Sequence, residues 1–236
     1  MKQRGPGRRA ETRYASMAVI TVSREFGSEG TDVAQHVAHV LSYHFVDKEL
    51  IKQLLYQYGL INFEEVYEAA PDFLARFDHR RSEIVNMITE VVRALARHGN
   101  AVILGRGAYA VLGGLSDVLN VRIKASLPAR VQWVMEHQGI LVPAEAEALV
   151  VERDKARAAF VEFSYGIQWD SLRAFDLMVD TDKIPERLAV KWVCEAHAQL
   201  LASRKGAPGE RSTKSIEVDP VLSGAVASAL ACQATH

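Results

Sequence analysis

The chain has 236 residues, of which 49% are hydrophobic and 24% are charged. This composition is that of a globular protein and excludes a chain that is disordered over its whole length. Its 28 lysines and arginines are balanced by 29 aspartates and glutamates, which gives a formal net charge of -1. A charge so close to zero disfavours nucleic acid or an anionic membrane as the main partner. Any site that binds phosphate must therefore be built from a local group of basic residues.

The two cysteines, Cys194 and Cys232, are too few for a structural zinc site and do not form the pattern of a secreted disulfide framework. No apolar stretch approaches the roughly 20 residues that span a bilayer, and the N-terminus lacks the hydrophobic stretch of a signal peptide. We therefore expect a cytoplasmic protein. Residues 1–16 are rich in arginine and glycine and predict a flexible basic arm, either a simple extension or a segment that binds an acidic partner.

The hydrophobic pattern predicts strands that alternate with helices. Short apolar runs typical of buried strands lie at 17–23, around Phe45, and at 101–105, 118–125 and 176–181. Helices are predicted at 31–42, 47–59, 62–98 with a break near Pro71, a short one ending at Gly113, 128–137, 143–165 and 185–203. Near-continuous apolar strands that alternate with helices indicate a parallel sheet covered on both faces. Residues 221–233 are compatible with a further helix whose place the sequence does not determine.

The segment from residue 17 to residue 42 is the most informative part of the chain. A strand, a loop with two glycines and the N-terminus of a helix follow one another, and such a turn presents backbone N–H groups and a positive dipole end to an anion. The loop departs from the phosphate-loop pattern GxxxxGK[ST] because it has no lysine, although Thr31 could offer a hydroxyl to a magnesium ion. By itself the pattern leaves open whether the loop binds phosphate or only connects strand and helix.

Six segments taken together resemble the cytidylate kinase-like family of phosphate-loop proteins. They are SREFGSEGTDVA, FVDKELI, VILGRGAYAVL, VRIKASLPARVQWVMEHQGI, RDKARAAFVEFSYGIQW and FDLMVDTDKI, in that family's order, and the resemblance covers about residues 17–195. It implies an α/β protein with the three-layer phosphate-loop kinase fold and a five-stranded parallel sheet. It further implies one domain at 17–203, with a helical acceptor-binding insertion at about 47–98 and a mobile lid at about 140–170. Residues 204–236 then form a polar linker and a C-terminal tail.

The resemblance also implies which residues hold the phosphate donor, ATP, with Mg²⁺. Five residues of the loop would wrap the donor: Ser23, Gly27, Ser28, Gly30 and Thr31, with Thr31 also at the metal ion. Arg24 would act in catalysis as the cation that replaces the missing lysine. A solvated surface arginine is the alternative interpretation of Arg24, and arginine's planar fork differs in geometry from a lysine ammonium in any case.

For the acceptor, the resemblance points first to Arg106. This arginine follows a predicted strand and matches the GRD segment with which cytidylate kinases hold the acceptor nucleotide. Gly107 stands where those kinases have aspartate, and this difference puts the identity of the acceptor in doubt. Asp47 is either a contact to the acceptor or to magnesium, or simply the cap of the helix that it precedes.

The predicted lid helix carries two further candidates for catalysis, Arg153 and Arg157. They are four residues apart and so share one face of the helix, and Asp154 could orient one of them and contact the substrate. A charged helix that closes over the reacting groups supplies positive charge and excludes water, as phosphoryl transfer requires. An ordinary solvated helix is the alternative.

Three functions are compatible with this sequence. The first is a kinase that transfers the γ-phosphoryl group of ATP to a nucleoside monophosphate, with CMP or dCMP as the first acceptors to consider. The second is a nucleotide- or anion-binding module that has lost catalysis, which the missing lysine, Gly107 and Glu29 favour, because a carboxylate in a phosphate loop repels its ligand. The third is a kinase of a small metabolite. The expected partners are a nucleotide donor and a small phosphate-bearing acceptor, and the oligomeric state stays open.

Overall fold

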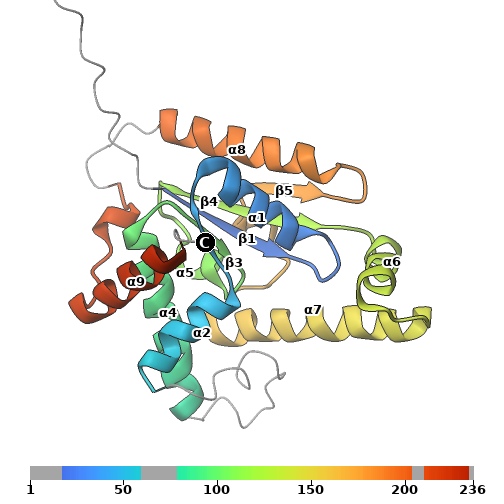
Figure 1. Cartoon of the computed structure of the whole chain (residues 1–236), viewed down its shortest axis with the longest axis horizontal. Coiled ribbons are helices and arrows are strands. Elements are labelled where there is room, and N and C mark those ends of the chain that lie inside the picture. Colours follow the sequence, from blue (N-terminus) through green and yellow to red (C-terminus); the bar gives the residue numbers. More distant parts are fainter. Residues whose placement is uncertain (1–17, 60–78, 204–209, 234–236) are drawn as a thin grey trace, which may run out of the picture.

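The computed structural model of the chain describes residues 18–59, 79–203 and 210–233. Three expectations lie outside the described residues: the basic arm at 1–16, the beginning of the insertion helix around Pro71, and the linker at 204–209. In the described parts, strands and helices follow one another in the predicted order (Figure 1).

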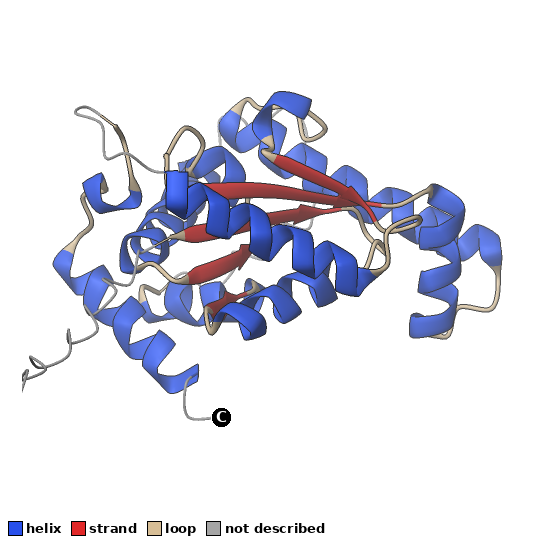
Figure 2. Cartoon of the chain, turned by 90° about the horizontal axis from the view of Figure 1, so that it is seen from above, coloured by secondary structure: helices blue, strands red, loops and turns tan. Residues whose placement is uncertain are grey.

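Five parallel strands form one sheet in the order β2-β3-β1-β4-β5 (Figure 2). The strands are β1 (Val19–Arg24), β2 (His44–Val46), β3 (Ala101–Leu104), β4 (Val118–Lys124) and β5 (Leu177–Asp180). In β1, Val19 is buried on one face of the sheet and Ile20 on the other, because successive side chains of a strand point to opposite faces. The α/β class and the five-stranded parallel sheet are thus confirmed.

Helices cover both faces of the sheet and complete three layers (Figure 1). The face that contains Ile20 is covered by α1 (Gly30–Leu41) and α8 (Glu186–Ser203). The face that contains Val19 is covered by α2 (Lys48–Gln57), α4 (His79–His98), α5 (Ala108–Val111), α9 (Pro220–Gln233) and the end of α7 (Pro143–Tyr165). Short 3-10 turns occupy Leu172–Ala174 and Thr213–Ser215. Across the described parts of the chain, no helix combines the length and hydrophobicity that crossing a bilayer requires.

The region predicted as a lid contains α7, whose first part packs against the preceding helix, α6 (Leu127–Gln138), beyond one end of the sheet (Figure 1). Val134 of α6 and Val150 of α7 are fully buried in a small cluster of their own, and Phe26 from the loop after β1 packs against it. The other end of α7 is anchored differently, since Phe160 belongs to the core on the Val19 face of the sheet. The apolar contact between the lid region and the loop is therefore small, and the mobility of the lid stays a prediction.

The C-terminal segment is built into the domain. Leu222, Val226 and Leu230 of α9 repeat every four residues and are buried in the same core as α4. Ahead of them, the buried carboxylate of Asp117 accepts hydrogen bonds from the backbone N–H and the hydroxyl of Thr213, at 2.8 and 2.7 Å. The sequence predicts a linker and tail at 204–236, and within the described residues 210–233 one face of α9 packs against the domain through Leu222, Val226 and Leu230.

We expect the chain to lose stability as the pH falls from 7 to 5, and His197 of α8 to account for part of the loss. His197 is 2% exposed, and its Nε2 atom lies 3.4 Å from the hydroxyl of Tyr43. Burial lowers the pKa of His197 below its ordinary value of 6.5. The unfolded chain therefore binds a proton that the folded chain excludes, so stability is lost as the pH falls through 6.5 toward the lowered folded value.

Urea denaturation at pH 7 and pH 5 measures this loss, which for one histidine is at most about 2 kcal/mol. His197→Gln does not titrate in this range and should show a weaker pH dependence than the unmodified chain. An undiminished dependence in that variant would assign the titration to other groups, such as His44, whose pKa is also lowered by burial and by His98.

Candidate active site

The candidate site lies where the carboxyl ends of the parallel strands meet, the edge at which open α/β sheets bind their ligands. Arg24 is the last residue of β1, Arg106 follows β3, and Lys48 follows β2 as the first residue of α2. Parallel strand directions bring these three basic residues to one edge, although they are far apart in the sequence. The common edge is the reason that a chain with almost no net charge can still have a basic site.

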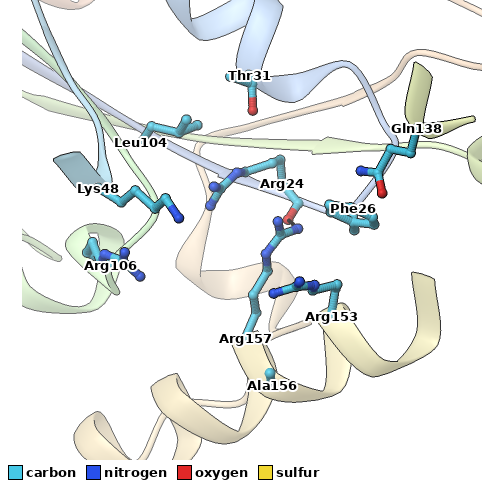
Figure 3. Close-up of a pocket in the computed structure, with 10 residues that line it drawn as sticks. All are labelled: Arg24, Phe26, Thr31, Lys48, Leu104, Arg106, Gln138, Arg153, Ala156 and Arg157. Carbon is cyan, nitrogen blue, oxygen red and sulfur yellow. Dashed lines mark hydrogen bonds between the residues drawn. The ribbon is translucent and has the colours of Figure 1, made fainter. Parts of the chain in front are cut away.

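A cavity of 360 Å³ opens at this edge (Figure 3). Among the residues that the structure describes, five basic ones line it: Arg24, Lys48, Arg106, Arg153 and Arg157. In Figure 3, Lys48 and Arg106 extend toward Arg24 from one side, while Arg153 and Arg157 reach into the same space from α7. Five like charges around one cavity create a positive potential that attracts anions.

A second cavity of 200 Å³ follows the loop after β1, and every residue from Arg24 to Asp32 lines it, together with Trp133 and Arg157. Gly27, Ser28, Gly30 and Thr31 are among these loop residues. Within the described part of the chain, four residues line both cavities: Arg24, Phe26, Thr31 and Arg157. These shared residues mark the place where a ligand in one cavity would meet a ligand in the other.

Hydrogen bonds fix the backbone of the loop. The N–H of Glu25 donates to the carbonyl of Ile123 at 3.1 Å, and the hydroxyl of Ser28 donates to the carbonyl of Glu25 at 2.9 Å. Thr181, after β5, donates its hydroxyl to the carbonyl of Ser28 at 2.9 Å. Glu29, directly before α1, has a φ of 55°, which costs a residue other than glycine about 1–2 kcal/mol. The loop is thus tied to β4 and to the end of β5, and Glu29 holds a strained backbone conformation within it.

Arg130 and Asp154 fasten α6 and α7 to this loop. Asp154 of α7 accepts a hydrogen bond from the N–H of Phe26 at 2.8 Å and forms an ion pair with Arg130 of α6. Arg130 also donates to the carbonyl of Ala125 at 3.1 Å. Arg157 lies 3.6 Å from the same Asp154 carboxylate and donates to the carbonyl of Arg24 at 3.2 Å. Asp154 lines neither cavity; it joins both helices to the loop.

Two other predicted site residues also have structural partners and line neither cavity. Ser23 is buried and accepts a hydrogen bond from the buried Arg122 at 2.8 Å. The Arg122 guanidinium stacks over the ring of Trp169 at 3.7 Å, and burial lowers its pKa although Glu25 acts in the opposite direction. Asp47 caps α2, because its carboxylate accepts from the N–H groups of Glu49 and Leu50 at 3.0 Å. The capping role expected for Asp47 is confirmed.

The GRG segment after β3 has an unusual backbone. Gly105, Arg106 and Gly107 have φ values of 74°, 55° and 67°, so three consecutive residues are left-handed. Arg106 is only 4% exposed, and its side chain lines the larger cavity. A left-handed backbone at an arginine that lines a basic cavity is strain of the kind that accumulates at functional sites.

The family model for the cytidylate kinase-like family matches residues 19–183, which includes all five strands. The chain belongs to this family. Among its relatives, a cytidylate kinase of Pyrobaculum calidifontis is 25% identical over 183 residues, covering 75% of this chain and 94% of the relative. A cytidylate kinase of Methanopyrus kandleri is 27% identical over 184 residues, covering 73% and 89%. An uncharacterized protein of Eubacterium ventriosum has a similar solved structure, with a TM-score of 0.63, 21% identity, and coverage of 78% of this chain and 99% of that one.

Several residues of this family member's site were not singled out from the sequence. Lys48 could have been found, since it follows β2 at the edge where Arg24 and Arg106 were expected. Phe26 and Gln138 line the larger cavity without any sequence signal of their own. Arg130 likewise gave no signal, because only the packing of α6 beside the loop brings it to Asp154.

Proposed function

We propose that the chain transfers the γ-phosphoryl group of ATP to a nucleoside monophosphate, with CMP or dCMP as the first acceptors to test. The observation that carries this proposal is the pair of adjoining cavities that share Arg24 and Arg157. The smaller cavity follows the loop and suits the donor phosphates, whereas the larger one suits the acceptor. Arginines at the junction supply positive charge where the phosphoryl group passes from donor to acceptor.

The donor would bind with Mg²⁺, as phosphoryl transfer generally requires. Thr31 lines both cavities, and Figure 3 shows its hydroxyl directed toward the larger one. Within the described residues no group of three or more His, Cys, Asp or Glu side chains is arranged to hold a metal ion. A single hydroxyl fits a magnesium ion that arrives with the triphosphate and keeps its water ligands.

The charge of the larger cavity favours an acceptor that carries phosphate. Each charged residue that lines it in the described part of the chain is basic. The phosphate of a nucleoside monophosphate is already ionised at neutral pH and can attack without losing a proton, whereas an alcohol acceptor needs a base to accept one. Both points favour a nucleotide acceptor over an uncharged metabolite.

A coupled assay of ADP release, run with ATP, Mg²⁺ and a panel of monophosphates that includes CMP, dCMP, UMP and AMP, tests the proposal. We expect turnover with at least one pyrimidine monophosphate. A second panel holds non-phosphorylated metabolites, and turnover with one of these alone would show that the acceptor is not a nucleotide. The absence of turnover with every acceptor in both panels would refute the kinase.

A binding module without catalysis is the second candidate, and Glu29 is the observation that favours it. Glu29 lines the smaller cavity, and a carboxylate there repels phosphate. Calorimetric titration with ATP separates the two functions: binding without turnover indicates a module, and binding with turnover indicates a kinase. Glu29→Gly should tighten ATP binding in either case, because it removes the carboxylate from the smaller cavity.

Arg106→Ala is expected to raise the KM for the acceptor about 10- to 100-fold, because a charge-assisted hydrogen bond to phosphate contributes about 1.5–3 kcal/mol. Arg106→Gly should raise the acceptor KM by the same factor. Its free energy of unfolding should be about 1 kcal/mol higher than that of Arg106→Ala, because glycine adopts a φ of 55° without strain. Steady-state kinetics and urea denaturation measure the two effects. An acceptor KM unchanged in both variants would remove Arg106 from the acceptor site.

A further inference from the structure

The phosphate-loop pattern can be placed on this chain in one register. When Thr31 stands at the final Ser/Thr of GxxxxGK[ST], Gly30 stands at the lysine and Arg24 at the first glycine. Glu29 stands at the second glycine, and its φ of 55° is the one that a glycine would favour. The loop therefore has a basic residue where the pattern has glycine, and glycine where the pattern has the basic residue.

The two exchanged positions are in direct steric contact. A Cβ atom placed on Gly30 would lie 2.5 Å from the Cβ of Arg24 and 3.1 Å from that of Ile123. The first distance is too short for any pair of carbon atoms that are not bonded to each other, and it involves the stem of the arginine, which cannot move aside without moving β1. While Arg24 is present, position 30 has no room for a lysine or any other side chain.

Backbone conformation does not explain the glycine. Gly30 is the first residue of α1 and is not one of the positions with a positive φ, so any residue could adopt its conformation. Glu29, by contrast, occupies a left-handed position without being glycine. Glycine is therefore present at position 30, where a side chain would have no space, and absent at position 29, where the positive φ would favour it.

Arg24 also lies in the right place to serve as the cation of the loop. It lines both cavities, and Arg157, the other basic residue shared by them, donates to its carbonyl. We propose that the loop has exchanged its cation and its glycine: Arg24 supplies the positive charge that position 30 supplies in the standard pattern, and Gly30 is glycine because the Arg24 side chain fills the space beside it. The catalytic half of this inference rests on the proposed kinase function, whereas the steric half does not.

The steric half is tested by thermal unfolding of Gly30→Ala in three backgrounds. With Arg24 present we expect a loss of about 5 °C in melting temperature, the usual scale for overpacking in a chain of this length. Arg24→Lys keeps the crowding Cβ, so Gly30→Ala should cost as much there. In Arg24→Gly the loss should fall below about 2 °C. Equal losses in all three backgrounds would overturn the coupling.

The catalytic half is tested by the exchanged variant Arg24→Gly/Gly30→Lys. Arg24→Gly alone should lower kcat about 10²- to 10³-fold, and the exchanged variant should recover at least about tenfold of that loss. An exchanged variant no more active than Arg24→Gly, beside an active unmodified chain, would overturn the inference. If the unmodified chain turns over no acceptor, the proposed function fails, and calorimetric titration with ATP then tests whether Arg24 replaces the missing cation. The affinity for ATP should drop in Arg24→Gly and return in the exchanged variant. An undiminished affinity in Arg24→Gly would overturn the inference.

Discussion

Replacing Arg157 by alanine is expected to lower kcat about 10²- to 10³-fold, with a smaller change in the KM of either substrate. The side chain of Arg157 is 15% exposed, lines both cavities, and is held by the carbonyl of Arg24 and the carboxylate of Asp154. A guanidinium fixed at the junction meets charge that develops during transfer, so its loss should raise the barrier more than it weakens binding. Steady-state kinetics with varied ATP and varied acceptor measures kcat and the KM of each substrate separately.

Two matched variants accompany this measurement. Lys155 is on the same helix, is exposed and lines neither cavity, so Lys155→Ala should leave kcat unchanged. Arg157→Lys keeps the charge but loses the planar fork, and it should recover only part of the activity. If Arg157→Ala keeps a kcat within about threefold of the unmodified chain while remaining folded, Arg157 does not act in transfer.

The second large effect concerns stability. Gly107→Ala should lower the free energy of unfolding by about 3 kcal/mol or more, because two penalties combine. The φ of Gly107 is 67°, and a Cβ there would lie 2.4 Å from Cε2 of Tyr165. The tyrosine ring has little freedom to move, since its hydroxyl lies 3.3 Å from that of Thr89 and its ring packs edge-on against Phe160. Urea denaturation followed by circular dichroism measures the loss.

Gly114→Ala is the control, because Gly114 has a φ of 78° but no atom lies within 4 Å of the position that a Cβ would occupy. It should cost only the conformational penalty of about 1 kcal/mol. Equal losses at the two glycines would show that Tyr165 moves aside freely. The same contact leaves no room for an aspartate side chain at position 107, because the Tyr165 ring fills the space beside it.

Much of the site could be anticipated from the sequence because its signals are local. Asp47 caps α2 as its position before an apolar helix predicts, and Gly139 ends α6. The apolar runs that precede Arg24 and Arg106 predict both residues at strand ends, and parallel strands carry such residues to one edge. Asp154 shows the limit of this reasoning. Helical spacing predicts that it orients Arg153 or Arg157, but its closest partners are Arg130 and the N–H of Phe26, which lies 128 residues away.

The sequence by itself determined the order of strands and helices along the chain, the parallel sheet, and Arg24 and Arg106 at the edge of that sheet, because hydrophobic period and capping depend on neighbours along the chain. Only the tertiary structure decided three further points. These are the packing of α9 into the core, the hydrogen bond from the buried Arg122 to Ser23, and the steric contact between the Arg24 side chain and position 30. Each of these depends on whether atoms from separate segments can occupy the same space, and the spacing of residues in one segment carries no information about that.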